Sequence, residues 1–202
     1  WSSDVCSSDL LFSTGGTPIF SIARGEGNIE KADRVLGATA FLLIASSIVL
    51  MVFFYITRRP VLFLFGASED SYYYADQYLR IYLAGTAFSM IQTGLNGFIT
   101  AQGFPRTGMV TTLIGAGLNL VLDPVFIFTL GMKISGAALA TVISQFVSCV
   151  WLLSFLTGKK ALHRLQKRCL RFDRGLSKEI CTLGISGFIM QATDSLEIGR
   201  AH

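Results

Sequence analysis

The sequence predicts an all-α integral membrane protein built as a multi-helix bundle. Of its 202 residues, 51% are hydrophobic and 15% are charged, and the mean hydropathy is +0.55. This composition is too apolar for an ordinary soluble domain. The charged residues are also unevenly spread, so that long uncharged stretches alternate with short charged ones. Each long stretch matches a helix that crosses a bilayer, which needs about 20 mostly apolar residues.

Both ends of the chain read as translated sequencing-adapter DNA. These ends are residues 1–10 and 197–202, and segments of this kind are left out when a fold is inferred. We expect the natural segment to run from residue 11 to residue 196 and to be cut at both ends.

The predicted spans follow one another along the chain at short intervals. Three of the full-length spans are free of charge, and the full-length span over 107–130 holds a single charged residue, Asp123. The first and last spans are shorter than a bilayer requires and read as parts of spans. In order, the predicted spans are about 11–23, 35–57, 81–104, 107–130 and 134–156, with the beginning of a further one at 179–196.

Lysine and arginine in the loops predict the orientation, because cytoplasmic loops of membrane proteins are enriched in both. Segments 24–34 and 157–178 and the turn at Pro105 fall on one side of the predicted membrane and hold twelve basic residues. The opposite side holds Arg58, Arg59 and Lys133. We therefore expect a multi-pass protein of the inner (cytoplasmic) membrane, with 157–178 in the cytoplasm. A positive-inside connector explains that loop better than a nucleic-acid site does.

A single carboxylate inside an apolar span is the strongest functional signal. Asp123 follows Asn119 by four residues, so both side chains project from one face of a helix. A carboxylate in a bilayer costs at least about 2.5 kcal/mol on insertion scales and usually serves an ion pathway or relay. Pro124 cannot donate a hydrogen bond to the Leu120 carbonyl and is expected to kink the helix there as a hinge. This face is suited to bind a cation or proton; the alternative is an Asp that caps a helix end at the membrane edge.

Two further spans carry stripes of polar side chains. One stripe contains Gln92 and Asn96, and the other contains Thr141 and Gln145, with spacings of three or four residues along one helical face. Such stripes can hold helices together through hydrogen bonds. They can equally line a cavity near the middle of the membrane, where secondary transporters bind substrate and ions. Polar faces on three neighbouring spans favour a cavity, with Gln92, Asn96 and Gln145 as candidate lining residues.

The cysteines and the histidine outside the adapters indicate neither catalysis nor a metal site. Cys149, Cys169 and Cys181 show no CxxC or CxxH spacing, so neither a metal nor a disulfide is predicted. His163 lies in the basic loop, where we expect a solvated side chain. No nucleophile–base set or phosphate-binding glycine loop can be assembled from the sequence. The chain is therefore not expected to be an enzyme or to need a cofactor.

Five groups of residues stand in a fixed order over 11–196. They are Leu64-Phe65-Gly66-Ala67-Ser68; Gly94-Leu95-Asn96-Gly97-Phe98-Ile99 with Ala101-Gln102-Gly103 and Pro105; Asn119 with Leu122-Asp123-Pro124 and Phe126-Ile127-Phe128; Gly136-Ala137-Ala138-Leu139-Ala140-Thr141-Val142-Ile143-Ser144-Gln145; and Gly184 with Phe188-Ile189-Met190-Gln191. Each group alone is a weak signal. Together their order and spacing resemble the multidrug and toxic compound extrusion (MATE) family of secondary transporters.

The resemblance implies a fold larger than this chain. Members of the family have twelve spanning helices in two six-helix lobes. Residues 11–156 would form an incomplete amino-terminal lobe, from the end of helix two through helix six. Residues 157–178 would then link the lobes, and residues 179–196 would begin the second lobe.

The resemblance also implies a site and an activity. Related members hold a cation with an aspartate on helix one and with residues that correspond here to Asn119, Asp123 and Thr141. The implied activity is antiport, with H⁺ or Na⁺ as the coupling ion, against organic cationic or amphiphilic drugs. The expected partners are therefore small molecules and the lipid bilayer, with no nucleic acid and no obligate protein partner.

Three other interpretations stay open. A lipid-linked sugar flippase of the same superfamily would favour cationic residues in the cavity, and none lies within 81–105 or 134–158. An intramembrane aspartyl protease needs two facing carboxylates; Asp123 and Asp194 lack the glycine-flanked signature of such enzymes. Lastly, these 202 residues without the first helix and the second lobe are not expected to transport on their own.

Overall fold

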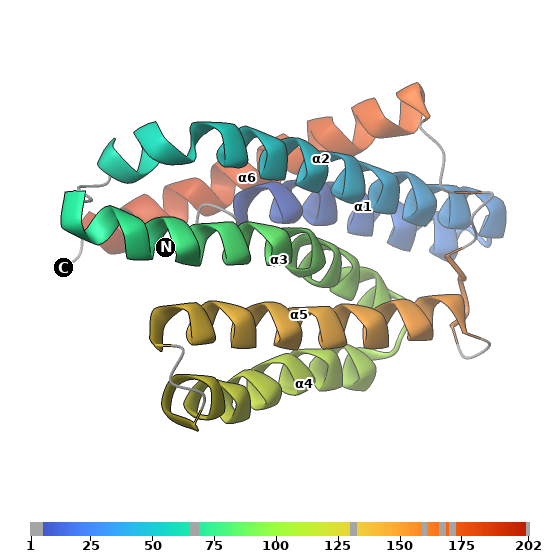
Figure 1. Ribbon diagram of the computed structural model, residues 1–202. Coiled ribbons are helices and arrows are strands. Elements are labelled where there is room, and N and C mark those ends of the chain that lie inside the picture. The colour runs from blue at the N-terminus through green and yellow to red at the C-terminus, as the bar shows by residue number, and fades with distance from the viewer. Residues whose placement is uncertain are drawn as a thin grey trace.

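The computed structural model describes residues 6–64, 69–129, 133–158, 161–165, 169 and 173–200, and these are almost entirely helical. The helices run roughly antiparallel as one elongated bundle, which confirms the predicted fold class (Figure 1). In chain order they are α1 (Cys6–Gly25), α2 (Ile29–Leu64), α3 (Glu69–Ala101), α4 (Pro105–Pro124), a π-helical turn η1 (Val125–Thr129), α5 (Lys133–Thr157) and α6 (Arg174–Arg200).

Several helices extend beyond the predicted spans. α2 continues to Leu64 and α3 begins at Glu69, where the sequence predicted spans ending at 57 and beginning at 81. The reason is that hydropathy marks the apolar part of a helix, whereas the backbone can stay helical through flanking charged residues. By length and composition, three of the described helices can cross a membrane: Ile29–Phe63, Pro105–Phe128 and Ser135–Thr157. α3 is not among them, because its polar stripe makes it less apolar.

The chain changes its helical form at Pro124. Regular α-helix ends at this residue, and η1 follows directly as a π-helical turn. Pro124 has no N–H and cannot continue the α-helical ladder, and the next amide, of Val125, donates to the Leu122 carbonyl. The interruption therefore falls where the sequence placed it, as a change of helical form after Asp123. Whether the helix bends there during function stays a prediction.

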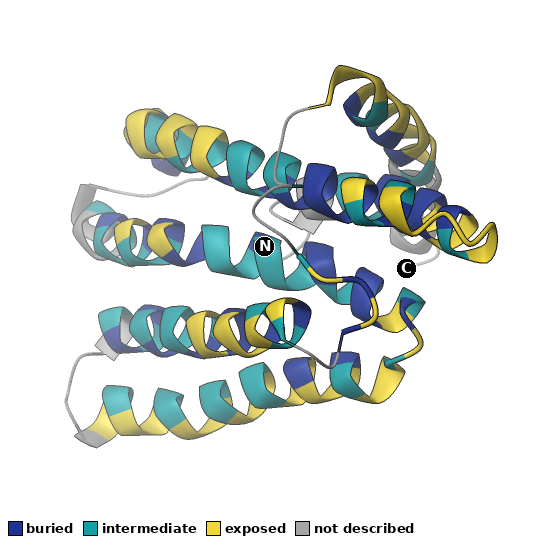
Figure 2. Ribbon diagram, turned by 90° about the vertical axis from the view of Figure 1, so that its right-hand side faces the viewer, coloured by how far each residue is buried: buried dark blue, intermediate teal, exposed yellow. Residues whose placement is uncertain are grey.

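α3 occupies the middle of the bundle and packs against α1, α2, α4 and α5. The main hydrophobic core lies between α1, α2 and α3 around Phe20, Leu36 and Phe98, which are fully buried. α4 lies at one side of the bundle, against α5 and α3, and is largely exposed or half-buried (Figures 1 and 2). The well-packed part of the molecule is thus the α1–α2–α3 group, and α4 and α5 form a thinner layer on it.

Three connections meet at one end of the bundle, on the right of Figure 1. The turns after α1 and α3 share one design: Gly27 and Gly103 have φ of +72° and +90°, and the next amide bonds back five residues to close the helix end. The Arg24 side chain donates to the carbonyl of Ala101 and so ties the two turns together. The loops that the sequence places on one side of the predicted membrane thus lie at one end of the bundle. We call this the basic end.

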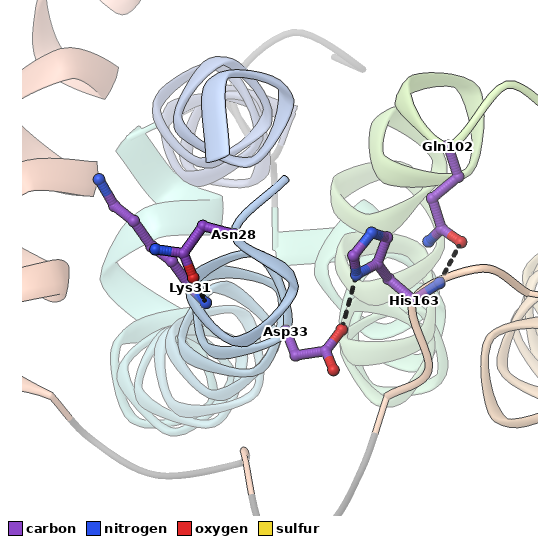
Figure 3. Close-up of polar contacts among 5 residues, drawn as sticks. All are labelled: Asn28, Lys31, Asp33, Gln102 and His163. Atoms are coloured by element: carbon purple, nitrogen blue, oxygen red, sulfur yellow. Dashed lines mark hydrogen bonds and ion pairs between the residues drawn. The ribbon is translucent and has the colours of Figure 1, made fainter. Parts of the chain in front are cut away.

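The prediction for His163 is wrong. Only 6% of this residue is exposed, and its side chain lies between α2 and α3 rather than in solvent (Figure 3). Its Nδ1 is 2.8 Å from Asp33 Oδ1, and its backbone N–H donates to Gln102 Oε1 at 3.1 Å. Nothing in the basic composition of the loop signals this burial, because the partners come from helices far away in the sequence.

Arginines at the opposite end of α2 and α3 converge on one carboxylate. Asp76 Oδ1 is 3.2 Å from Arg58 Nε, and its Oδ2 is 2.6 Å from an Arg80 nitrogen. Arg80 thus joins the three basic residues that the sequence placed on this side. We call this the acidic-pin end, after Asp76.

Candidate cation site

The structure brings together two of the three residues predicted to hold a cation. Asn119 on α4 donates from Nδ2 to Thr141 Oγ1 on α5 at 3.2 Å. Thr141 in turn donates its hydroxyl hydrogen to the Ala137 carbonyl of its own helix at 3.0 Å. The Thr141 hydroxyl therefore donates one hydrogen bond, which fixes its orientation, and accepts the other. The contact forms because both side chains lie at the interface between α4 and α5.

Asp123 lies one turn beyond Asn119 on α4 and is half-buried. Its Oδ1 is buried and has no hydrogen-bond partner among the residues that the structure describes. A buried acceptor without a partner is costly, and in native proteins it usually points to a role or to a missing ligand. The carboxylate therefore has one oxygen that can accept a proton or coordinate a cation.

Tyr78 on α3 is a further candidate for this site, and sequence reasoning missed it. Its phenol lies within electrostatic range of Asp123 and stacks on Tyr82, with ring centroids 5.7 Å apart. Nearby, Ser135 on α5 bonds to Gln77 on α3 at 3.3 Å. Tyr78 and Gln77 precede the predicted span that begins at 81, so neither belongs to a predicted polar stripe. The signal that would have found them is the continuation of α3 toward Glu69.

The candidate cavity residues do not gather at one place. Gln145 lies one turn after Thr141, and its Oε1 is 3.3 Å from the position that a Cβ on Gly85 of α3 would take. Asn96 instead faces Gly108 on the first turn of α4, where a Cβ would come within 3.1 Å of Asn96 Oδ1. Gly108 and Asp123 are fifteen residues apart on the chain, or about 22 Å along a helix at 1.5 Å per residue. Asn96 is thus near the basic end, far from Asp123.

These positions bear on the two interpretations of the polar stripes. Asn96 and Gln145 contact glycines of a neighbouring helix, as residues at close helix–helix interfaces do. Asn96 Oδ1 is nevertheless buried without a partner in the described part of the chain, which packing alone does not explain. Gln92 is half-buried on α3. Both a packing role and a pathway role for Gln92, Asn96 and Gln145 remain predictions.

The chain matches one family model and a set of curated relatives. The family model described as MatE matches residues 9–125. Multidrug export protein MepA of Staphylococcus haemolyticus (strain JCSC1435) is 27% identical over 191 aligned residues, which cover 86% of this chain and 42% of the relative. MepA of Staphylococcus aureus (strain NCTC 8325 / PS 47) is 25% identical, and the alignment again covers 86% of this chain and 42% of the relative. The chain thus spans less than half the length of these relatives.

Solved structures agree with this fold. A crystal structure described as MATE in the bent conformation superposes with a TM-score of 0.88 at 25% identity, over 96% of this chain and 44% of that one. The inward-facing conformation of a multidrug resistance MATE family transporter gives a TM-score of 0.86 at 24% identity, over 93% and 43% of the two chains. The helices described above therefore correspond to rather less than half of such a protein.

Proposed function

Because this chain belongs to the MatE family, we propose that it forms part of a secondary transporter that exports drugs and toxic organic cations in exchange for H⁺ or Na⁺. The curated relatives named above are multidrug export proteins, and the chain covers 42% of their length. Export would then be an activity of a longer protein in which these helices make up most of one lobe. The family membership and the apolar helices support a multi-pass place in the cytoplasmic membrane.

The coupling cation binds at Asp123, Asn119 and Thr141 in this proposal. The observation that carries it is a half-buried carboxylate with an unpartnered oxygen, one helical turn from an amide already bonded to a hydroxyl. A carboxylate and neutral oxygens are ligands suited to a hard cation, and the carboxylate alone suffices for a proton. Binding at this site drives export only if the cation and the drug prefer different arrangements of the protein. The change of helical form after Asp123 supports Pro124 as the place where those arrangements differ.

The decisive test replaces Asp123 with Asn in the full-length transporter. Asp123→Asn keeps the side-chain size but removes the charge and the site of protonation. We expect it to abolish drug efflux from energised membrane vesicles while the amount of protein in the membrane stays unchanged. Glu30→Gln is the matched control, because the Glu30 side chain is 77% exposed and its loss should leave efflux intact. Undiminished efflux in Asp123→Asn would refute the assignment.

A second arm of the same assay identifies whether H⁺ or Na⁺ is the coupling ion. Collapsing the proton gradient and the sodium gradient one at a time should stop efflux with only one of the two. A lipid-linked sugar flippase is the alternative, and it predicts no drug efflux under either gradient. The uncharged stretches 81–105 and 134–158 favour a cationic or neutral cargo over a pyrophosphate.

A further inference from the structure

Three buried oxygens without partners lie along one face of α4. They are Oδ1 of Asp123 itself, Oγ of Ser148 on α5 and Oδ1 of Asn96 on α3, and none has a hydrogen-bond partner among the residues that the structure describes. Ser148 Oγ is 2.8 Å from the position that a Cβ on Gly115 would take, and Asn96 Oδ1 is 3.1 Å from the corresponding position at Gly108. Residues 108, 115 and 123 follow one another at steps of seven and eight, which puts them on one helical face. We call this face, with its contacts to α3 and α5, the α4 seam.

The unpartnered oxygens make the packed arrangement of the α4 seam costly. A buried polar group without a partner has given up the hydrogen bonds that water would make with it, so it disfavours the arrangement that buries it. The two glycines opposite carry no side chain that could donate instead. Water would satisfy all three oxygens if α4 stood further from α3 and α5. The polar groups of the seam therefore favour an opened, hydrated arrangement.

Few other contacts hold α4 in place. Within the described part of the chain, one hydrogen bond joins α4 to a neighbouring helix, and it runs from Asn119 to Thr141. Only Gly108 and Thr111 of α4 are buried, so this helix has no large apolar side chain that is fully enclosed. In a bilayer, an apolar surface that leaves the protein meets lipid tails rather than water, so parting two helices has no hydrophobic cost. Opening of the α4 seam is therefore cheap in comparison with opening of the main core.

The main core contains the same kind of contact, but there large side chains enclose it. Thr39 of α2 is fully buried, and its Oγ1 has no hydrogen-bond partner in the described part of the chain. This oxygen is 2.5 Å from the position that a Cβ on Gly16 of α1 would take, and Gly16 also packs against the ring of Phe98. Parting α1 from α2 would break the packing of that fully buried ring. Thr39 is thus a matched control for Ser148.

We propose that α4 is a gate that swings away from α3 and α5 to let water and the coupling cation reach Asp123. In the packed arrangement Asp123 Oδ1 is buried, so a cation from water reaches this oxygen only when the α4 seam opens. The turn between α3 and α4 stays in place, because Arg24 of α1 holds the Ala101 carbonyl. The displacement therefore grows along α4 toward Asp123. The inference that the gate serves export rests on the proposed function.

Opening of the seam is tested in the full-length transporter by the reactivity of a cysteine at position 148. In a background with every native cysteine replaced by alanine, Ser148→Cys places a thiol against Gly115. We expect a small cationic methanethiosulfonate to label it at least about tenfold faster than the thiol of Thr39→Cys, because the core opens less often than the seam. Ser148 and Thr39 are both fully buried, so exposure in the packed arrangement does not bias the comparison. Equal labelling rates would refute the gate.

Removal of the unpartnered hydroxyl is a second test, and its sign separates the gate from a structural contact. Ser148→Ala should stabilise the packed arrangement, so we expect the midpoint of thermal unfolding to rise by about 2–4 °C and drug efflux to slow about tenfold. Thr39→Val should also raise the midpoint but leave efflux unchanged. If Ser148 instead stabilised the bundle through its contact with Gly115, Ser148→Ala would lower the midpoint, and the gate would be overturned.

Ser144 supplies a control within α5. It is buried, and its hydroxyl already donates to the Ala140 carbonyl of its own helix at 2.8 Å, so Ser144→Ala removes no unpartnered oxygen. We expect it to change neither the unfolding midpoint nor efflux. A raised midpoint with undiminished efflux in Ser148→Ala would overturn the role of the gate in loading the cation. Absence of efflux in the parent protein would instead count against export, and the labelling rates would still decide whether α4 opens.

Discussion

The two ends of this bundle are held together in different ways. At the basic end, Phe20 and His163 are buried, and the contacts among α1, α2 and the two later connections are made by packing and by hydrogen bonds. At the acidic-pin end, a smaller hydrophobic cluster around Leu79 and Leu83 is joined by the buried carboxylate of Asp76, which holds two arginines, one of them the 51% exposed Arg80. A buried hydrophobic contact does not depend on ionic strength, whereas exposed ion pairs are weak and screened. The basic end should therefore be the more stable of the two.

This difference matters because the candidate cation site lies away from the basic end. Asp123 lies in the last turn of α4, at the end away from the basic end. Tyr78 of α3, which interacts electrostatically with Asp123, is two residues from Asp76. Elements that move during function come from the less stable parts of a protein. We therefore expect the packed basic end to serve as the fixed base, and the region around Asp123 to change arrangement.

Removing the aromatic side chain at the centre of the basic end should lower the stability of the protein more than any other substitution proposed for the two ends. Phe20 is fully buried and contacts Phe98, at 5.3 Å between centroids, and His163. Phe20→Ala should lower the free energy of unfolding by about 3–5 kcal/mol, the usual cost of a large cavity. Denaturant titration in detergent micelles, followed by circular dichroism, measures it. Ile22→Ala on the same helix is the control, since Ile22 is exposed and should cost little. Equal losses in both variants would contradict the packing described.

The acidic-pin end should respond less strongly. Asp76→Ala leaves Arg58 and Arg80 facing each other without their shared carboxylate, and we expect a loss of about 1–3 kcal/mol. Arg80→Ala should cost less than about 1 kcal/mol, because Arg80 is half-exposed and its pair is screened. The same denaturant titration, repeated at high salt, checks both. If Asp76→Ala proves as costly as Phe20→Ala, the two ends are held equally firmly and the comparison fails.

The sequence predicts the helices and their order well, because each rests on local information. Stretches with at most one charged residue locate α2, α4 and α5, and Gly103 and Pro105 locate the turn between α3 and α4. The contact between Asn119 and Thr141 is a different matter. It came from a resemblance that names these positions, since the spacing within each helix does not say which helices meet.

The burial of His163 and the proximity of Tyr78 to Asp123 were not predictable in this way. Both depend on partners far away in the sequence: His163 and Asp33 are separated by 130 residues. A single sequence carries periodicity along one helix but not the rotation of one helix against another. The basic surroundings of His163 even pointed in the wrong direction, because a loop rich in Lys and Arg reads as solvated.

A last pair of variants separates backbone strain from side-chain contact at the basic end. Gly103 closes α3 with a φ of +90°, and a Cβ there would meet only Arg24, at an ordinary 3.9 Å. Gly103→Ala should therefore cost about 1–2 kcal/mol through the left-handed conformation alone. Gly25→Ala, two residues before the equivalent turn at Gly27, has no positive φ and open space around it. It should be neutral or stabilise by up to about 1 kcal/mol, because alanine restricts the unfolded chain. Opposite signs in the denaturant titration would show that these turns are fixed by backbone conformation; matching signs would mean that the Arg24 contact with the α3 turn decides their stability.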